Sequence, residues 1–190
     1  MLLKVTEIID MKNQKRHILG CLLTLTLLSS LAHAKVETYD VLKKKVTLDV
    51  PADWEVINKT VGVPLKLIGP MFKDYRPVLI VVPLDVKEER MNFKDEKKAE
   101  ESYKVSKLAW LQSVNAKLIS FLPLKSFKTS NAEFYQFSYL YQMKEENYEE
   151  KSFYVKCKEQ TFHLKTVISM EHAARWESTV KPLVESFNCK

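Results

Sequence analysis

Alternating apolar and polar positions mark the region before residue 70 as β-structure. Residues 46–50 alternate as a half-buried strand does, and the turn sequence Pro51-Ala52-Asp53-Trp54 interrupts the pattern before residues 55–57 resume it. A third short strand is expected at residues 65–68, ahead of Gly69-Pro70. The pattern therefore predicts a strand, a turn and two further strands.

An unbroken aliphatic run, Val-Leu-Ile-Val-Val, occupies residues 78–82 and is followed by Pro83. A strand with one face in water alternates apolar and polar side chains, whereas a run without polar positions is typical of a strand covered on both faces. We therefore predict a central strand at residues 78–82 that is buried on both faces and ends at Pro83.

From residue 92 to about residue 115 the apolar residues recur every three or four positions, which predicts one amphipathic helix of about five or six turns. Asp95 and Glu96 fall in its first turn, where negative charge suits the helix dipole. The apolar stripe consists of Ala99, Tyr103, Trp110, Leu111 and Val114.

Four strands separated by short polar turns should follow this helix. Short connections between consecutive strands imply antiparallel pairing. The middle turn is expected at Glu145-Glu146-Asn147 and the last around Glu159-Gln160. The four strands are expected at residues 117–127, 132–143, 152–158 and 161–168.

The second of these strands carries four aromatic side chains at two-residue spacing, which are Tyr135, Phe137, Tyr139 and Tyr141. The period of a strand places all four on one face. We interpret this face as one packed under a helix, because large aromatic side chains belong mostly to cores. The alternative is that the four residues line an apolar pocket for a small ligand or a lipid.

A second helix is expected after Ser169, which is a suitable N-cap residue. Pro182 should kink or restart this helix, because proline cannot donate the interior hydrogen bond. The residues that repeat at helical spacing and would pack on the sheet are Ala173, Trp176, Val180, Leu183, Val184 and Phe187.

The first 34 residues have the three parts of a secretory signal peptide. Lys12, Lys15 and Arg16 precede an apolar run at residues 18–31, and Ala32-His33-Ala34 forms a cleavage site. Cleavage is expected between Ala34 and Lys35. This leaves a single domain at residues 35–190, located in the periplasm or outside the cell.

Three further points concern the leader. Its apolar run is shorter than the roughly 20 residues that a membrane-spanning helix needs, so an uncleaved anchor is disfavoured and no stable membrane insertion is expected after cleavage. Lipidation at Cys21 is disfavoured because the apolar core of a lipoprotein signal precedes the cysteine, whereas Lys15 and Arg16 precede this one. Translation from Met11 would give a cleaner signal than translation from Met1.

The charge balance argues against nucleic-acid binding. The leader carries four basic and two acidic residues, so the mature chain keeps a net charge of +4 out of the +6 of the whole sequence. This charge suits a soluble protein but is too small for a nucleic-acid footprint.

Two cysteines remain after processing, Cys157 and Cys189. An exported chain with one pair of cysteines predicts a disulfide, because oxidising compartments form and keep such bonds. Two free buried thiols are the alternative, and a metal pair is disfavoured because two sulfurs do not complete a site.

The mature sequence contains no motif for catalysis, a metal or a cofactor. His163 and His172 have no ligand at the spacing that metal sites use, and Gly62 and Gly69 belong to no phosphate-binding loop. We therefore expect no enzyme activity, no cofactor and no metal.

The order of elements resembles the PsbP-like superfamily over residues 40–189. The residues that carry the resemblance are the Pro51/Trp54 turn after the first strand, Gly69-Pro70 before the aliphatic strand, and a last helix that runs from Trp176 to Ser186-Phe187. The resemblance implies an α+β fold, with a central antiparallel sheet flanked by helices on both faces as an α/β/α sandwich.

The members of this superfamily include a photosystem accessory subunit, a nuclear factor that binds the Ran GTPase, and bacterial exported proteins of the DcrB type. Binding and assembly are what they share, so the resemblance implies an exported accessory protein that binds another protein or an envelope component. Fold alone does not fix function, and the identity of the partner and the oligomeric state stay open.

Overall fold

The computed structural model describes residues 35–60, 63–84, 93, 95–130, 132–157 and 160–189. The predicted signal peptide, with Met11, Cys21 and Ala34, lies outside the described residues, as does Gly62. The helices are α2 (Glu96–Ser113), η1 (Met170–His172) and α3 (Ala173–Glu185). The strands are β1 (Lys35–Val41), β2 (Lys44–Val50), β3 (Glu55–Thr60), β4 (Val63–Ile68), β5 (Val78–Leu84), β6 (Lys117–Lys128), β7 (Glu133–Met143), β8 (Glu146–Lys156), β9 (Thr161–Ser169) and β10 (Asn188–Cys189).

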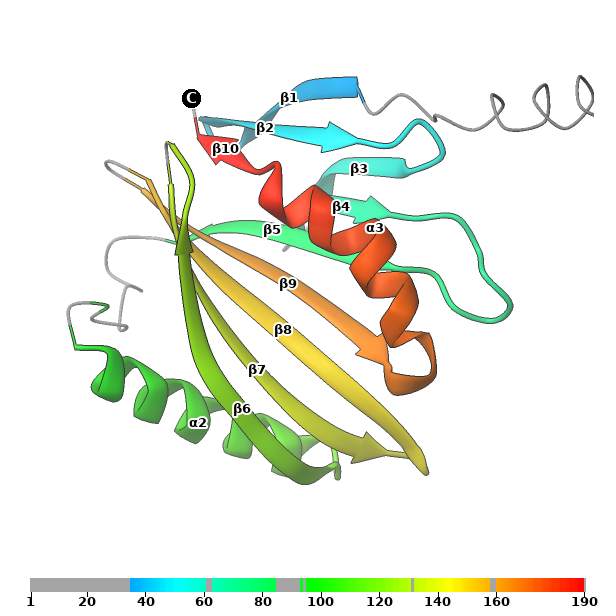
Figure 1. Ribbon diagram of the computed structural model, residues 1–190, viewed down its shortest axis with the longest axis vertical. Helices are drawn as coiled ribbons and strands as arrows, with labels where there is room; N and C mark the ends of the chain where they lie inside the picture. The colour runs from blue at the N-terminus through cyan, green and yellow to red at the C-terminus, as the bar shows by residue number, and fades with distance from the viewer. Residues whose placement is uncertain are drawn as a thin grey trace, which may run out of the picture. The chain divides into compact units, whose positions relative to one another are not determined.

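Seven strands form one antiparallel sheet in the order β3-β4-β5-β9-β8-β7-β6. The predicted antiparallel meander of β6 to β9 is confirmed, because each of these strands pairs with the next one along the chain. A second, three-stranded sheet has the order β1-β2-β10. Figure 1 shows the large sheet as a twisted ribbon and the small one beside β3.

The large sheet has a different core on each face. On one face, α3 and the small sheet pack together over residues such as Leu79, Val81 and Phe153. On the other face, α2 packs over the aromatic side chains of β7. In Figure 1, α2 (green) lies beside β6, and α3 (red) lies between the small sheet and β9.

The α+β class and the central antiparallel sheet agree with the expectation, but helices alone do not flank the sheet. The small sheet shares one face with α3, and the sequence pattern did not predict β1 or β10. Five of the seven residues of β1 are polar or exposed, and β10 has only two residues, so neither strand gives a hydrophobic period.

Strand β8 starts six residues before the predicted position. The expected turn at residues 145–147 instead lies at Lys144-Glu145, which have positive φ angles of 50° and 69°. The polar residues after it pair with both β7 and β9, and two of them, Glu149 and Glu150, are buried with basic partners. The prediction failed because it assumed that consecutive glutamates lie in water.

Strand β5 differs from the prediction on its second face. Leu79 and Val81 are fully buried on the α3 face, but Val78, Ile80 and Val82 on the other face are only partly buried. The strand also continues through Pro83 to Leu84. The strand is therefore interior in the sheet, and the described residues bury one of its faces fully and the other only partly.

The ends of the two helices also depart from the sequence prediction. Asp95 caps α2 by accepting a 3.2 Å hydrogen bond from the backbone N–H of Lys98, so this helix begins later than residue 92. Ser169 precedes η1 rather than α3, and its side chain makes no capping hydrogen bond. Pro182 does not restart α3, which runs on to Glu185.

Candidate functional site

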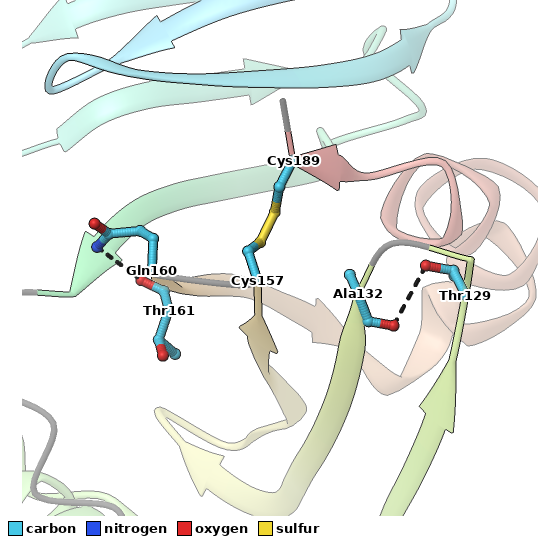
Figure 2. The surroundings of a disulfide bond; sticks show 6 residues. All are labelled: Thr129, Ala132, Cys157, Gln160, Thr161 and Cys189. Carbon is cyan, nitrogen blue, oxygen red and sulfur yellow. Dashed lines mark hydrogen bonds between the residues drawn. A yellow bond between two sulfur atoms is a disulfide. The ribbon is translucent and has the colours of Figure 1, made fainter.

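The structure contains a disulfide between Cys157 and Cys189, whose Cα atoms are 6.2 Å apart (Figure 2). Cys157 directly follows β8 in the large sheet, and Cys189 belongs to β10 in the small sheet. The backbone N–H of Cys157 also donates to the carbonyl of Gln160 at 2.8 Å. The disulfide thus ties the C-terminal strand and the small sheet to the large one.

Lys35, on the carboxyl side of the predicted cleavage site, is the first residue of β1. Its ammonium group lies 3.4 Å from the carboxylate of Glu37. Cleavage after Ala34 would therefore leave β1 intact at the start of the mature chain, and cleavage itself stays a prediction.

The four aromatic residues of β7 lie on one face of the sheet and are buried, which is the arrangement that the sequence favoured. Tyr135, Phe137, Tyr139 and Tyr141 are each at most 8% exposed. The ring of Phe137 lies 4.8 Å from that of Tyr103 on α2, and Tyr141 meets Trp110 edge-on at 5.6 Å. These side chains form the packing layer between α2 and the sheet.

Within this layer lies a buried ion cluster that the sequence analysis missed. Glu150 on β8 is fully buried, and its carboxylate contacts the ammonium groups of Lys107 on α2 at 2.5 Å and Lys165 on β9 at 2.7 Å. The hydroxyls of Tyr139 and Ser152 donate to the same carboxylate at 3.1 and 3.2 Å. We call Lys107, Glu150 and Lys165 the Glu150 cluster.

Burial and charge act against each other in the Glu150 cluster. Burial opposes the charged form of Glu150, but the two ammonium groups outweigh it and hold the pKa of this carboxyl below its usual value. Burial lowers the pKa of Lys107, against the attraction of Glu150. One carboxylate balances one of two ammonium groups, so the cluster carries a net charge of +1.

His163 on β9 lies beside this cluster and stacks on Tyr154 at 4.7 Å. Burial, followed by the charge of Lys107, lowers the pKa of His163 to about 4. Its Nε2 atom has no hydrogen-bond partner among the described residues. His163 is therefore neutral at pH 7 and adds no charge.

The sequence did contain one signal for the Glu150 cluster. Lys107 lies four residues after Tyr103 and four before Leu111, so it occupies the buried stripe of the predicted helix. A lysine at such a position needs an acidic partner from elsewhere in the fold. Its partner could not be read from the sequence, because Glu150 lies 43 residues away.

On the opposite face, a groove of about 540 Å³ lies between α3 and the strands β6 to β8. One wall is the ridge of α3 that carries Glu177, Lys181 and Glu185 at four-residue spacing. We call this surface the α3 groove. It is lined by Lys125, Ser126, Phe127, Gln136, Lys151, Trp176, Glu177, Lys181 and Glu185.

The floor of the α3 groove carries a lysine, Lys151, that is held by an ion pair and by contact with an aromatic ring. Lys151 pairs with Glu149, and its ammonium group lies 4.5 Å from the ring centroid of Trp176. The indole N–H of Trp176 has no hydrogen-bond partner among the described residues. The groove therefore combines two largely buried rings, Phe127 and Trp176, with charges of both signs, which suits a polypeptide segment better than an apolar molecule.

A second hollow, of about 490 Å³, lies on the α2 side of β6. It is bounded by the first turns of α2 and by the middle of β6, where the register with β7 shifts between Leu122 and Lys125. Its wall on α2 includes the ion pair of Glu100 and Lys104. None of the four aromatic residues of β7 lines either hollow.

No group of three or more His, Cys, Asp or Glu side chains that could hold a metal comes together in the part of the chain that the structure describes. His172 instead stacks on Tyr75 at 4.8 Å and lies 3.7 Å from the carboxylate of Asp74.

Among the described residues, no helix has the length and apolar character to cross a membrane.

No protein-family model matches the sequence, and the search of curated proteins found no similar protein. Solved structures do match. The solution structure of CyanoP, the PsbP of the cyanobacterium Synechocystis sp. PCC 6803, superposes with a TM-score of 0.57 at 12% identity, over 86% of this chain and 99% of that chain. The chain has a PsbP-like fold.

A second protein with a similar fold is LpqN of Mycobacterium tuberculosis, described as involved in cell envelope biogenesis. Its crystal structure matches with a TM-score of 0.51 at 12% identity, over 83% of this chain and 92% of LpqN. At this identity the likeness concerns the fold and gives no site residues.

Three of the residues that carry the PsbP-like resemblance, Pro51, Trp54 and Gly69, lie together in the structure. The backbone N–H of Trp54 donates to the carbonyl of Pro51 at 3.0 Å, which closes the turn after β2. A Cβ atom on Gly69 would lie 2.5 Å from Pro77 and 3.1 Å from the indole of Trp54. Glycine is therefore required at residue 69 for Trp54 to pack in the core.

Proposed function

We propose that this protein is an exported accessory protein that binds another protein or a component of the cell envelope, without catalysing a reaction. The observation that carries the proposal is the α3 groove. It places the partly buried ring of Phe127 and charges of both signs between a helix and a sheet, above the core residue Trp176, and such a mixture of aromatic and charged groups is typical of protein interfaces.

Three further observations support this proposal. The leader predicts export, and a disulfide between Cys157 and Cys189 suits an oxidising compartment. The fold is shared with a cyanobacterial PsbP and with LpqN, which is described as involved in cell envelope biogenesis. We infer from these that the protein acts in the periplasm or outside the cell.

Site-directed photocrosslinking in the native host tests this proposal. A photoreactive residue replaces Gln136 on the floor of the α3 groove, and a matched control carries it at Lys98 on the exposed side of α2. We expect a reproducible adduct from position 136 alone, which is lost when Lys125→Glu and Lys181→Glu alter the charges along the groove. Equal yields at both positions, or no adduct at position 136, would contradict the proposal.

A further inference from the structure

The partly exposed face of β5 is the starting point for a second surface. Among the described residues, Val78, Ile80 and Val82 are included in neither hydrophobic core, although Leu79 and Val81 between them are fully buried. The sequence of β5 is that of a strand with both faces covered. The described residues cover one face fully and the other only in part.

This surface extends across four strands in one row of the sheet. Ile57 on β3 pairs with Lys66 on β4, Lys66 pairs with Ile80 on β5, and Ile80 pairs with Lys165 on β9. Beyond Lys165 the row continues to Ser152 on β8, where the layer under α2 begins. We call Ile57, Lys66, Val78, Ile80, Val82 and Lys165 the open sheet face.

The backbone of the open sheet face is already paired on both sides at β4, β5 and β9, whereas β3, which carries Ile57, is an edge strand of the large sheet. Strands β4, β5 and β9 each pair with a strand on both sides, so an added strand has no edge to bind there. Recognition must come from packing on side chains. A helix that lies on the sheet beside α2 would complete the layer that α2 begins, in the way that helices cover sheets in two-layer and three-layer folds.

The positive charge of the open sheet face favours a partner that carries carboxylates. Lys66 lies in its centre, and Lys165 at its border is 29% exposed and belongs to the Glu150 cluster, whose net charge is +1. The pair of Glu55 and Arg76 at the rim is neutral. A second copy of this chain would bring lysines against lysines, whereas carboxylates flanking an apolar stripe would complement them.

We propose that the open sheet face is a docking site for an amphipathic helix of a partner protein that bears carboxylates beside its apolar stripe. The aliphatic side chains of β5 bury the stripe, and Lys66 and Lys165 pair with the carboxylates. The site lies on the face of the sheet opposite the α3 groove, so this proposal and the proposed use of the groove can fail separately.

Methyl NMR tests the docking site directly. The mature protein, labelled at Ile, Leu and Val methyls, is titrated with a synthetic peptide of about 18 residues, long enough to hold a helix, with leucines on one face flanked by glutamates. We expect the methyls of Val78, Ile80 and Val82 to shift, with smaller changes at Leu79 and Val81 on the other face. Lys66→Glu should weaken binding by about tenfold, and Lys98→Glu should leave it unchanged.

A peptide of the same sequence with lysine in place of glutamate is the charge control, and it should not bind. The proposal is overturned if the acidic peptide causes no shifts at these methyls, or if both peptides bind equally. It is also overturned if sedimentation shows a dimer that shields the same methyls, or if phosphatidylglycerol vesicles shift them without peptide.

Discussion

The two faces of the large sheet are covered by cores of different composition. On the α3 face, an almost wholly apolar core lies under α3 and the small sheet, and the disulfide fastens this cover. On the α2 face, aromatic rings surround the Glu150 cluster, and the aliphatic residues of β5 lie beyond the helix. Among the described residues, the first face is covered by α3 and the small sheet, whereas the second depends on paired charges and leaves the side chains of β5 only partly buried.

Strand β8 shows how one segment serves both faces. Phe153 and Val155 belong to the core under α3, while Glu150 and Tyr154 point to the α2 side. The two-residue period of a strand separates them. Substitutions on the α3 face should therefore disturb an apolar core, whereas substitutions on the α2 face should disturb buried charges and aromatic packing.

Glu150→Gln should have the largest effect. It leaves Lys107 and Lys165 close together in a buried place without a carboxylate, so the free energy of unfolding at pH 7 should fall by about 3–5 kcal/mol in urea titrations. The matched control is Glu100→Gln, which breaks a more exposed pair with Lys104 and should change stability by less than about 1 kcal/mol. Similar losses in the two variants would show that the Glu150 cluster does not support the α2 face.

Cys189→Ser tests the fastening of the α3 face. Removal of a disulfide between residues 32 positions apart should lower the free energy of unfolding by about 3–4 kcal/mol in the chain-entropy account. Reductant should destabilise the natural protein and leave the variant unchanged. Equal stability of the two proteins without reductant would mean that α3 and the small sheet hold without the disulfide.

The α2 face should also make stability depend on pH through His163. Because burial lowers the pKa of His163 to about 4, the unfolded chain, with a histidine pKa of about 6.5, binds the proton first. The contribution of His163 is complete above about pH 6.5 and is lost as the pH falls toward 4, by about 2–3 kcal/mol.

The measurement is the difference in unfolding free energy between the natural protein and His163→Phe at pH 7, 6 and 5. Phenylalanine keeps the stacking on Tyr154 and does not titrate. The nearby Glu150 titrates in both proteins, so its contribution largely cancels. A difference that stays constant with pH would contradict the assignment of a neutral His163 whose Nε2 atom is buried.

Local patterns predicted most strands and both α-helices, because alternation and helical spacing follow directly from burial on one face. The pattern could not place β10, because its two residues pair with Val46 and Thr47 of β2, which lie far away in the sequence. It also misplaced the start of β8, because the partners that allow Glu150 to be buried lie on α2 and β9. Ion pairs between residues far apart in the sequence were therefore the feature that the local pattern could not predict.

The burial of β5 differs between the sequence prediction and the structure. The aliphatic run predicted two covered faces, and the described residues bury Leu79 and Val81 fully but Val78, Ile80 and Val82 only partly. We attribute the difference to a missing partner rather than to a mistaken pattern.

A single pair of substitutions tests this attribution most directly: Val81→Thr and Val82→Thr, identical changes on opposite faces of one strand. Val81→Thr buries an unpaired hydroxyl and should lower the free energy of unfolding by about 1–2 kcal/mol, without weakening the binding of the acidic peptide. Val82→Thr should change stability by less than about 0.5 kcal/mol and weaken that binding. Equal losses of stability, or unchanged peptide binding by Val82→Thr, would contradict the account.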